Sequence, residues 1–562
     1  MDNKAIAREF KLFAKLLEFH GDNPFKIKAI SNAAATISKL PFAITSKSTQ
    51  ELNEISGMGK STANKINEIL EKGHMSELND LVQQTPPGII PLLKIKGISP
   101  KKMSVIWKEL GIDSKTELWY ACKDDKISKL KGFGAKTQAE LQSILEYAME
   151  NQGKFRFADA EKTVDKLLAE LRDQLDSDTK FALTGEMRRL SELVNKIEIL
   201  VGLPKDALTT VLQNIDWLEE IAQADDHIQC QHASGISVIF YYCEPALFSV
   251  RLLETTGSET HIIQLKSNLP KKELPAFESE EDIYGLAKMS FIPPEMREGN
   301  DEVNLALAHS IPNLVEFSDI KGALHNHSLW SDGVFSIEEM ALYCRDQLKL
   351  EYFGISDHSK TAVYANGLNI DRILEQWKEI DLLNEKLAPF LIFKGIESDI
   401  LANGALDYPD EILAGFDFVV ASIHSQLSMD EKKATARLIK AIENPYTTFL
   451  GHPTGRQLLV RKGYPIDHKK VIDACAANQV MIEINANPLR LDIDWRWLSY
   501  CLEKGVTLSI NPDAHHTEEL EYMKYGIHMA RKGGLQIEHC FNCLDAKQVS
   551  NYFATRKANI NP

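Results

Sequence analysis

The feature that most constrains this chain is a series of short apolar segments, from about residue 320 onward, that end in histidine or a carboxylate. The first is Gly322-Ala323-Leu324, which His325, Asn326 and His327 follow directly. Similar segments lie at 353–358, 391–399, 418–424, 449–452, 480–485 and 508–515, and the stretches 370–387, 430–443, 467–478 and 495–504 are interpreted as helices. Repeated strand–helix units of this kind predict a (β/α) barrel, in which the carboxyl ends of the strands gather their side chains at one face.

The first of these strand ends carries candidate metal ligands. His325 and His327 are two residues apart, so on a strand their side chains point to the same face and can share a metal ion. Asp332 follows in a Ser-Asp-Gly turn and can add an oxygen ligand. A lone His-x-His pair is more often structural, so a metal site here depends on ligands from the later strand ends.

Length and composition point to a protein of several domains. A chain of 562 residues is too long for one core, and about two to four domains are expected. We expect no membrane segment, because the start is polar and no stretch approaches the roughly 20 apolar residues that span a bilayer. The eight cysteines are scattered, which favours a reducing cytoplasm, and the close pair Cys540 and Cys543 is interpreted as structural.

The charge is distributed unevenly. Residues 1–150 contain 22 Lys and Arg against 18 Asp and Glu, a net charge of +4, whereas the whole chain has a net charge of −16. Any contact with nucleic acid is therefore expected at the N-terminal end, although a solvated lysine-rich surface would look similar.

Three segments of these first 150 residues share one frame, after predicted helices at 3–20 and about 26–39. Each has an apolar residue, a tight glycine turn and a new helix that carries lysine. The residues concerned are Gly57, Gly59 and Lys60; Gly97, Ser99 and Lys101; and Gly132, Gly134 and Lys136. Glycine lets the backbone turn tightly and approach a ligand, and amides at a helix start can bind phosphate oxygens. We interpret them as helix–hairpin–helix motifs that bind a DNA backbone independently of sequence; the alternative is tight turns in a packed helical region.

The middle of the chain predicts a mixed α+β region. We expect a helix over 161–177 and strands at 180–184, 196–202, 236–243 and 247–253. Three groups of residues carry motifs: Gly185, Glu186, Arg188 and Arg189; Thr256, Gly257 and Ser258; and the segments 282–284 and 291–299.

On these motifs the chain resembles the X family of DNA polymerases, in the bacterial PolX arrangement that adds a C-terminal PHP (polymerase and histidinol phosphatase) domain. The resemblance implies an all-α helix–hairpin–helix region, a nucleotidyltransferase-like palm of the α+β class, and a PHP domain that is a distorted (β/α)7 barrel. The expected parts are a lyase-like region at 1–80, a fingers-like region at 81–152, a palm and thumb-like region at 153–300, a linker at 301–318 and the PHP domain at 319–562.

The polymerase site departs from the family pattern. The family places two aspartates in a Gly-Asp-x-Asp strand, where this chain has Lys196 and Glu198. A lysine at the first position would repel Mg²⁺, and two-metal phosphoryl transfer needs carboxylates. The segment 236–242 contains no acid, and Glu186 replaces the hydroxyl that follows Gly185 in the family. We therefore expect a degenerate polymerase site and loss of nucleotide transfer.

In the PHP region the resemblance assigns metal ligation to nine residues: His325, His327, Asp332, His358, Glu397, His424, His452, Asp513 and His515. It implies three divalent ions with Glu397 bridging two of them, and imidazole with carboxylate suits Mn²⁺, Zn²⁺ or Fe²⁺. Arg456 is a candidate phosphate contact, with a surface salt bridge as its alternative.

Further residues of this region have candidate supporting roles. Asp399, Glu483, Asn485 and His516 are candidates for orienting the ligands. Asp357 is expected to orient a ligand or to cap a helix. Trp330 and Tyr364 are expected to stack a terminal base or to pack in the rim.

The favoured function is that of a DNA-binding, metal-dependent phosphodiesterase, and the resemblance implies a 3′–5′ exonuclease in DNA repair. Alternatives are an active X-family polymerase, a small-molecule phosphatase of the histidinol-phosphatase type and a DNA-binding scaffold without catalysis. The resemblance also implies gapped DNA or 3′ ends as partners, and the sequence indicates no oligomeric state.

Overall fold

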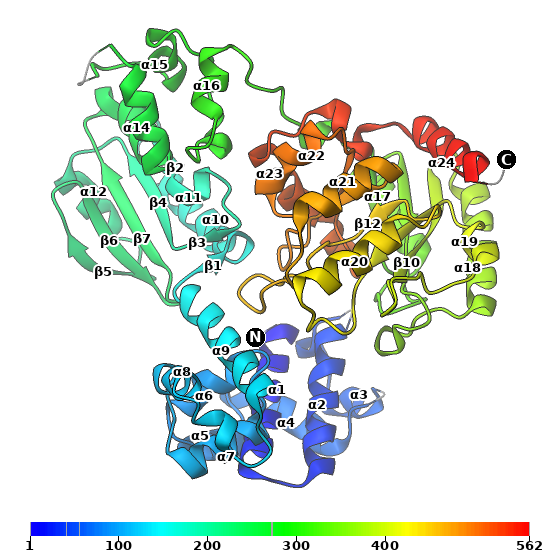
Figure 1. The fold of residues 1–562 in the computed structure, drawn as a ribbon. Helices are drawn as coiled ribbons and strands as arrows, with labels where there is room; N and C mark the ends of the chain where they lie inside the picture. Colours follow the sequence, from blue (N-terminus) through cyan, green and yellow to red (C-terminus); the bar gives the residue numbers. More distant parts are fainter. Residues whose placement is uncertain (1, 41, 56, 271–273, 561–562) are drawn as a thin grey trace. The chain divides into compact units, whose positions relative to one another are not determined.

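The computed structural model describes residues 2–40, 42–55, 57–270 and 274–560 (Figure 1). The chain divides into two compact units, Met1–Gln152 with Leu459–Arg461, and Gly153–Leu458 with Lys462–Pro562. Every strand of the described residues lies in the second unit. No helix in the described ranges is long and apolar enough to cross a membrane.

The first unit is all-α, as predicted. Its helices are α1 (Asn3–His20), α2 (Pro24–Lys39), α3 (Thr49–Glu54), α4 (Lys60–Lys72), α5 (Ser76–Gln84), α6 (Ile89–Lys94), α7 (Pro100–Leu110), α8 (Lys115–Lys123) and α9 (Ala135–Glu150). The first helix shows which local features make these residues helical. Asp2 caps α1 by accepting a hydrogen bond from the Ala5 amide, and Gly21 ends it in a left-handed conformation. Phe10, Phe13 and Leu17 lie on one buried face of α1 at helical spacing.

The second unit begins with a mixed sheet of the order β2-β4-β7-β6-β5. Only β4 and β7 run parallel; the other neighbours are antiparallel. The elements are β1 (Phe155–Arg156), α10 (Phe157–Gln174), β2 (Phe181–Thr184), α11 (Gly185–Arg188), β3 (Leu193–Val194), β4 (Lys196–Val201), α12 (Lys205–Leu212), β5 (Leu218–Gln223), β6 (His227–His232) and β7 (Ser237–Tyr242).

The strand predicted at 247–253 is wrong, because these residues lie in or next to the helix α13 (Phe248–Thr256). Phe248 and Val250 are buried, which resembles strand alternation, but the next buried apolar residue is Leu253, at helical spacing from Val250. Arg251 pairs with Glu254 one helical turn away, at 3.3 Å. The strands β5 and β6 were missed because their short sequences are rich in polar residues.

Three more helices follow, α14 (Glu259–Asn268), α15 (Glu280–Leu286) and α16 (Glu302–Leu307). The helix α16 falls within 301–318, where the sequence predicted a linker. Its Val303 and Ala306 belong to the same buried cluster as Leu265 and Ile283. The start of this stretch is thus packed against the preceding helices.

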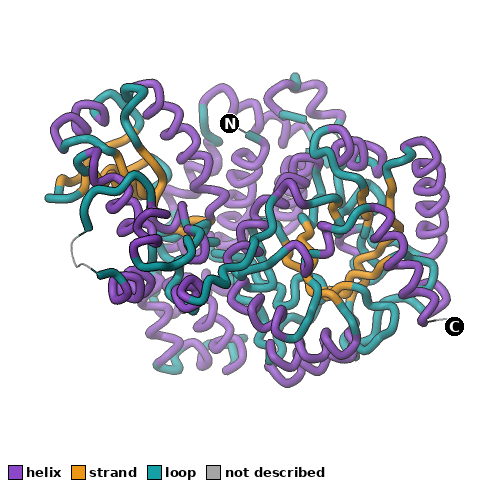
Figure 2. Tube along the Cα trace, turned by 90° about the horizontal axis from the view of Figure 1, so that it is seen from above, coloured by secondary structure: helices purple, strands orange, loops and turns teal. Residues whose placement is uncertain are grey.

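The rest of the second unit is a seven-stranded parallel sheet whose strands neighbour one another in chain order, β8 to β14. Its strands are β8 (Gly322–Ala323), β9 (Tyr352–Ile355), β10 (Leu391–Asp399), β11 (Phe418–Ser422), β12 (Phe449–Leu450), β13 (Met481–Asn485) and β14 (Leu508–Asn511). The helices are α17 (Ile337–Asp346), α18 (Ile370–Leu387), α19 (Asp410–Leu413), α20 (Glu431–Ile442), α21 (His468–Asn478), α22 (Leu498–Glu503), α23 (Met523–Lys532) and α24 (Ala546–Ile560). In Figure 2 these strands form a curved row with helices outside it.

The row of strands is nearly closed into a barrel. Beyond β8 and β14, Asn326 bridges to Ala514, and the His327 amide donates to the Ala514 carbonyl at 2.8 Å. At the other end, Val549 and Phe553 of α24 pack with Tyr352, Phe418 and Phe449, which are the first residues of their strands. The helix α24 therefore covers the amino ends of the strands, and the carboxyl ends remain for a site. This arrangement confirms the predicted (β/α)7 class.

Candidate metal centre

The loop after β8 carries the first three candidate ligands, but not in the way the sequence predicted. The strand β8 ends at Ala323, and His325 has a left-handed backbone with φ of 58°. Strand alternation therefore does not place His325 and His327 on one face. The turn of the backbone does so instead, and the two imidazole centroids lie 5.4 Å apart.

Asp357 holds this loop in place. Its buried carboxylate accepts hydrogen bonds from the Ser328 amide and hydroxyl, both at 2.7 Å, from the Ser331 hydroxyl at 2.5 Å and from the Gln376 amide at 2.7 Å. Burial raises the pKa of Asp357 in spite of these donors. Of its two expected roles, the structure shows the orienting one, because Asp357 fixes the segment between His327 and Asp332. It caps neither α17 nor α18, whose capping residues are Ser336 and Asn369.

The remaining candidates come from the other strand ends. Glu397 lies within β10, while the rest follow their strands at the carboxyl end of the barrel, as the sequence predicted: His358 after β9, His424 after β11, His452 after β12, and Asp513 and His515 after β14. His325, His327, His358, Glu397, His452 and Asp513 are buried, and Asp332, His424 and His515 are partly buried.

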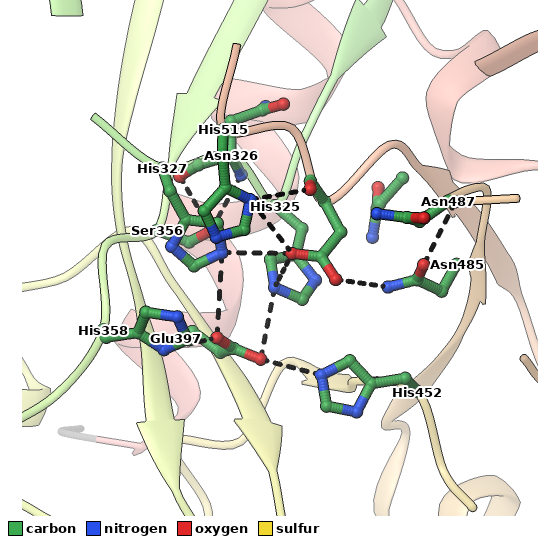
Figure 3. A network of polar contacts seen from close by, with 12 residues as sticks. His325, Asn326, His327, Ser356, His358, Glu397, His452, Asn485, Asn487 and His515 are labelled. Atoms are coloured by element: carbon green, nitrogen blue, oxygen red, sulfur yellow. Dashed lines mark hydrogen bonds and ion pairs between the residues drawn. The ribbon is translucent and has the colours of Figure 1, made fainter. Parts of the chain in front are cut away.

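Glu397 is the centre of the cluster (Figure 3). Its Oε1 lies 3.0 Å from His452 Nε2, 3.2 Å from His424 Nε2 and 3.3 Å from His325 Nε2. Its Oε2 lies 2.9 Å from His358 Nδ1 and 3.7 Å from His327 Nε2. The two oxygens of one carboxylate thus face two different sets of imidazoles.

The other carboxylates complete the cluster. Asp332 Oδ1 lies 3.3 Å from His515 Nε2 and 3.6 Å from His358 Nε2, and Asp513 Oδ1 lies 3.2 Å from His327 Nε2. Three groups bring their ligand atoms within 4.8 Å of one another: His327, Asp332, His358 and His515; His325, His327 and Asp513; and His358, Glu397 and His424. All nine predicted residues except His452 belong to these groups, and His452 contacts Glu397 directly.

The electrostatics of this cluster attract positive charge. Although burial raises the pKa of Glu397 and Asp513, the surrounding imidazoles outweigh it and hold both pKa values well below the usual range. Burial lowers the pKa of His424 and His515, but Glu397 and Asp399 around the first and Asp332 around the second raise both values to about 9. His327 differs, because burial and its neighbours His515 and His358 lower its pKa to about 3.

The donor atoms fit divalent cations. Within the described part of the chain, His325 Nε2, both ring nitrogens of His327, His358 Nδ1 and Glu397 Oε2 are buried without a hydrogen-bond partner. Such orphaned groups are costly, yet these atoms stand at the separations of about 3 to 3.5 Å that ligands of one ion have when their bonds are about 2.1 Å long. Imidazole with carboxylate suits Zn²⁺, Mn²⁺ or Fe²⁺.

Neighbouring side chains orient the imidazoles. Asp399 Oδ1 lies 2.5 Å from His424 Nδ1, and the buried Glu483 accepts from His325 Nδ1 through one oxygen and from the His452 amide through the other, at 2.8 Å. Asn485 donates to Glu483 and to Asp513. His516, the fourth candidate for this role, instead accepts the Glu518 amide and caps a short helical turn that follows it.

The structure changes the assignment of arginines. Arg456, the candidate phosphate contact, uses its guanidinium to bind Asp494 at 2.5 Å, the Arg490 carbonyl at 2.9 Å and the Leu491 carbonyl. Its fork is therefore directed at the chain itself, in a partly buried version of the salt bridge considered as the alternative. Arg490, which sequence reasoning missed, lies against the cluster, with Nε 3.2 Å from Asp513 Oδ2. Its place just after a strand with ligand-like residues was the signal that could have indicated it.

The two aromatic candidates differ in exposure. Trp330 is half-buried, and its Nε1 donates to Glu379 at 2.8 Å, which is the packing role. Tyr364 is 70% exposed, and its ring centroid lies 6.2 Å from that of His358. Tyr364 is thus the aromatic side chain that solvent reaches beside the cluster.

The predicted polymerase site has its charged groups paired with one another. Lys196 Nζ lies 2.8 Å from Glu198 Oε1, and Tyr241 donates to the same oxygen at 3.0 Å. Glu186 accepts from the Asn195 amide and side chain. Gly185 has φ of 59°, and a Cβ at this position would collide with the Glu198 carboxylate.

The two arginines after Glu186 are also engaged. Arg188 binds the buried Glu280, and Arg189 binds Glu298 at 3.1 Å and the Thr256 carbonyl. The guanidinium groups are therefore neutralised inside the unit.

The three hairpins share one backbone geometry. Gly57, Gly97 and Gly132 all have positive φ, between 85° and 94°, which favours glycine. The helices that follow are α4, α7 and α9, and Lys60, Lys101 and Lys136 are exposed at their starts. Gly59 and Gly134 provide no side-chain cap, whereas Ser99 accepts the Lys102 amide of its own helix. The first and third hairpins thus leave their helix-start amides without a side-chain cap.

None of the eight cysteines, all of which lie in the described residues, forms a disulfide, and this includes the close pair Cys540 and Cys543.

Comparison with known proteins supports both halves of this description. Residues 1–75 match a family described as helix-hairpin-helix domain, and residues 89–145 match a SAM-like helix-hairpin-helix tandem. The chain is 35% identical, over 98% of its length and 99% of the relative's, to the DNA polymerase/3′-5′ exonuclease PolX of Bacillus subtilis (strain 168). It is also 29% identical to probable phosphatases of Thermoanaerobacter sp. (strain X514) and Acetivibrio thermocellus, over 32% and 35% of this chain and 75% and 80% of those proteins.

Proposed function

Because this chain belongs to the PolX family, we propose that it is a DNA-binding, metal-dependent phosphodiesterase that acts as a 3′–5′ exonuclease in DNA repair. The observation that carries the proposal is the buried Glu397 carboxylate, whose two oxygens face five imidazoles at 2.9–3.7 Å. Such a concentration of donor atoms at the carboxyl end of a barrel is a metal-dependent hydrolytic site rather than a packing feature.

The proposed ligands are the nine residues His325, His327, Asp332, His358, Glu397, His424, His452, Asp513 and His515. The three groups of donor atoms support three divalent ions, and Mn²⁺, Zn²⁺ and Fe²⁺ all suit the donors. Bound cations of this kind lower the pKa of water and stabilise negative charge on phosphate oxygens.

The chain's own residues prepare the site for hydrolysis. Asp399 accepts from His424 Nδ1, so that Nε2 faces Glu397, and Glu483 in the same way fixes the ring of His325. In the reaction, water adds to phosphorus, the bond from phosphorus to the 3′ oxygen breaks, and that oxygen takes up a proton. The products are a nucleoside 5′-monophosphate and a chain shorter by one nucleotide.

The DNA backbone is proposed to bind at the hairpins. Their exposed lysines and glycine turns support contacts with phosphates that do not depend on sequence. Gapped DNA and free 3′ ends are the proposed forms.

We further propose that nucleotide transfer has been lost. Lys196 stands where a metal-binding carboxylate would be required and is paired with Glu198, and Arg188 and Arg189 are neutralised by Glu280 and Glu298. These residues would therefore offer no free carboxylate to a Mg²⁺ ion and no free guanidinium group to a nucleotide triphosphate. Primer extension with Mg²⁺ or Mn²⁺ tests this, and template-dependent incorporation by the purified chain would overturn it.

The division into parts at 1–80, 81–152, 153–300, 301–318 and 319–562 is likewise proposed, on the same family pattern. We propose a reducing compartment, the cytoplasm, which is consistent with eight cysteines that form no disulfide in the described residues.

The exonuclease proposal is tested by time-resolved digestion of 3′- and 5′-labelled single-stranded, duplex and gapped DNA with Mn²⁺. We expect the 3′ label to be released first, as a mononucleotide, by the parent protein. His325→Ala should abolish digestion while DNA binding remains, because His325 lies in the barrel and not in the hairpins. A variant that digests DNA like the parent would show that the assigned site is wrong.

A second function is tested by direct comparison, because two relatives that match about a third of this chain are named probable phosphatases. Hydrolysis of a small phosphomonoester, such as p-nitrophenyl phosphate, tests it. If Lys60→Glu with Lys136→Glu lowers DNA digestion but leaves monoester hydrolysis unchanged, the two activities share the centre and differ in their use of the hairpins. Monoester hydrolysis without any DNA digestion would favour the phosphatase.

A further inference from the structure

Arg490 is a cation that lies directly against the proposed metal ligands. It follows β13, and its side chain is 16% exposed. It forms an ion pair with a proposed ligand, through Nε and Asp513 Oδ2 at 3.2 Å. Within the described residues its guanidinium makes no further hydrogen bond or ion pair. Its two terminal nitrogens therefore remain available to a ligand.

The backbone of Arg490 is held from behind. Arg456 Nε donates to the Arg490 carbonyl at 2.9 Å, and its terminal nitrogens bind the Leu491 carbonyl and Asp494. The Arg490 amide donates to the Asn487 carbonyl at 2.7 Å. Arg456 thus fixes the backbone segment from which the Arg490 side chain extends. Arg490 is therefore a fixed donor rather than a mobile surface side chain.

The charge of Arg490 acts on the cluster itself. It contributes to the lowered pKa of Asp513, after the larger effects of His325 and His327, and it lowers the pKa of His452 further than burial alone does. A guanidinium in this position adds a positive charge beside the cations. Its planar fork matches the spacing of two phosphate oxygens, which a lysine cannot reproduce.

Tyr364 provides an apolar surface beside the same centre. It is 70% exposed, its neighbour Val363 is 81% exposed, and Leu489, next to Arg490, is 40% exposed. The Tyr364 ring lies 6.2 Å from the ring of His358. A nucleotide has both features that such a pair would recognise, a phosphate and an apolar base.

We propose that Arg490 binds a non-bridging oxygen of the phosphate that is cleaved, and that Tyr364 packs against the base of the 3′-terminal nucleotide. The proposal rests on the exonuclease function proposed above and names the residues that hold its substrate. Arg456 is then a positioning residue, which acts on the substrate through Arg490.

The two contacts can be separated with two chromogenic diesters. p-Nitrophenyl thymidine 5′-monophosphate carries a base, and methyl p-nitrophenyl phosphate carries neither a base nor a second ring. In both, water adds to phosphorus and p-nitrophenolate leaves. Steady-state rates, metal content and the dissociation constant of the product, thymidine 5′-monophosphate, are measured for the full-length parent, Arg490→Gln, Arg490→Lys, Tyr364→Ala and the surface control Arg345→Gln.

Arg490→Gln should lower kcat/KM at least tenfold on both diesters and weaken product binding at least tenfold, with the metal content unchanged. Arg490→Lys should recover part of the product affinity but not the parent rate, because it keeps the charge and loses the fork. Tyr364→Ala should lower kcat/KM about tenfold on the thymidine diester and less than twofold on methyl p-nitrophenyl phosphate. Arg345→Gln, a change at an exposed pair with Asp346, should match the parent.

Three results would overturn this assignment. One is parent-like hydrolysis and product binding by Arg490→Gln. Another is a loss of product affinity that is explained by lower metal content alone, so that the metal-loaded fraction of Arg490→Gln binds the product as tightly as the parent does. The third, for Tyr364, is an equal loss on both diesters. A parent protein that hydrolyses neither diester and no DNA would instead refute the proposed function, so the two failures are distinguishable.

The role of Arg456 is tested by a double-mutant comparison. Arg456→Gln alone should weaken product binding. Added to Arg490→Gln, it should raise the dissociation constant of the product less than twofold further, because Arg456 acts on the substrate only through Arg490. Independent, multiplicative losses would contradict the positioning role.

Discussion

Replacing Glu483 with glutamine perturbs two proposed metal ligands at once while preserving the shape of the side chain. One oxygen of Glu483 accepts from His325 Nδ1 and from the Asn511 side chain at 3.1 Å. The other accepts from the His452 amide at 2.8 Å and from the Asn485 side chain at 3.2 Å. All four partners are donors, and Glu483 is fully buried.

The magnitude follows from this count. A glutamine amide offers one oxygen and one NH₂ group, so whichever way it is oriented, two of the four donors face another donor. Each buried donor left without an acceptor costs about 1–3 kcal/mol, which gives about 2–6 kcal/mol in total. Because two of the four donors belong to the proposed ligands His325 and His452 themselves, part of this cost should appear as weaker metal binding, with an expected loss of affinity of about 10–100-fold.

The assay is a calorimetric titration of the metal-depleted protein with Mn²⁺ or Zn²⁺, which gives the metal affinity. Thermal unfolding is measured with and without metal. Glu503→Gln, the same substitution at an exposed residue, is the matched control. Glu483→Gln should bind metal at least tenfold more weakly than this control. Metal affinity within twofold of the parent would refute the reasoning that Glu483 orients two ligands.

Further predictions concern stability, pH and DNA affinity. Lys532→Met should lower the free energy of unfolding by about 3 kcal/mol, measured by denaturant titration against the exposed control Lys378→Met, because the buried Lys532 ammonium binds Glu298 and the Arg189 carbonyl. An unchanged midpoint would contradict this. Burial lowers the pKa of His528 to about 4, below the value of about 6.5 expected in the unfolded chain. The unfolded state therefore takes up the proton first, so that this contribution to stability is complete above about pH 6.5 and is lost as the pH falls towards 4, by up to about 3 kcal/mol. His528→Gln should flatten the pH dependence over this range, and identical profiles for parent and variant would exclude the effect. Lys60→Glu and Lys136→Glu should each weaken DNA binding and reduce its salt dependence more than Lys101→Glu, because Ser99 already caps the helix of the second hairpin. Equal losses at the three lysines, measured by fluorescence anisotropy, would contradict that distinction.

Much of the barrel could be predicted from the sequence because a parallel barrel converts chain order into position. Each apolar segment that ends in histidine or a carboxylate brings its last residues to the same face, so ligands far apart in sequence could be grouped without a structure. The hairpins were readable for a similar reason, since a glycine with positive φ and a helix start are local features. Gly57, Gly97 and Gly132 each have that geometry.

Three kinds of feature could not be predicted from the sequence: a backbone turn after a strand, the direction of a long side chain, and the type of a short apolar segment. His325 lies beyond its strand with a left-handed backbone, so the right pair of residues was identified by an incorrect geometric reason. Arg456 and Arg490 are equally basic in sequence, and only the backbone around Asp494 shows which guanidinium is used internally. The helix α13 imitated a strand because Phe248 and Val250 alternate over a window too short to exclude it.

The cluster around Glu397 is the central claim, and metal content tests it most directly. The measurement is elemental analysis of the purified full-length chain and of Glu397→Gln after dialysis against metal-free buffer. We predict about three divalent ions per parent chain, one for each group of donor atoms, and the loss of at least one ion in Glu397→Gln together with nuclease activity. A parent chain that digests DNA but contains no metal, or a variant that keeps both its metal and its activity, would contradict the claim.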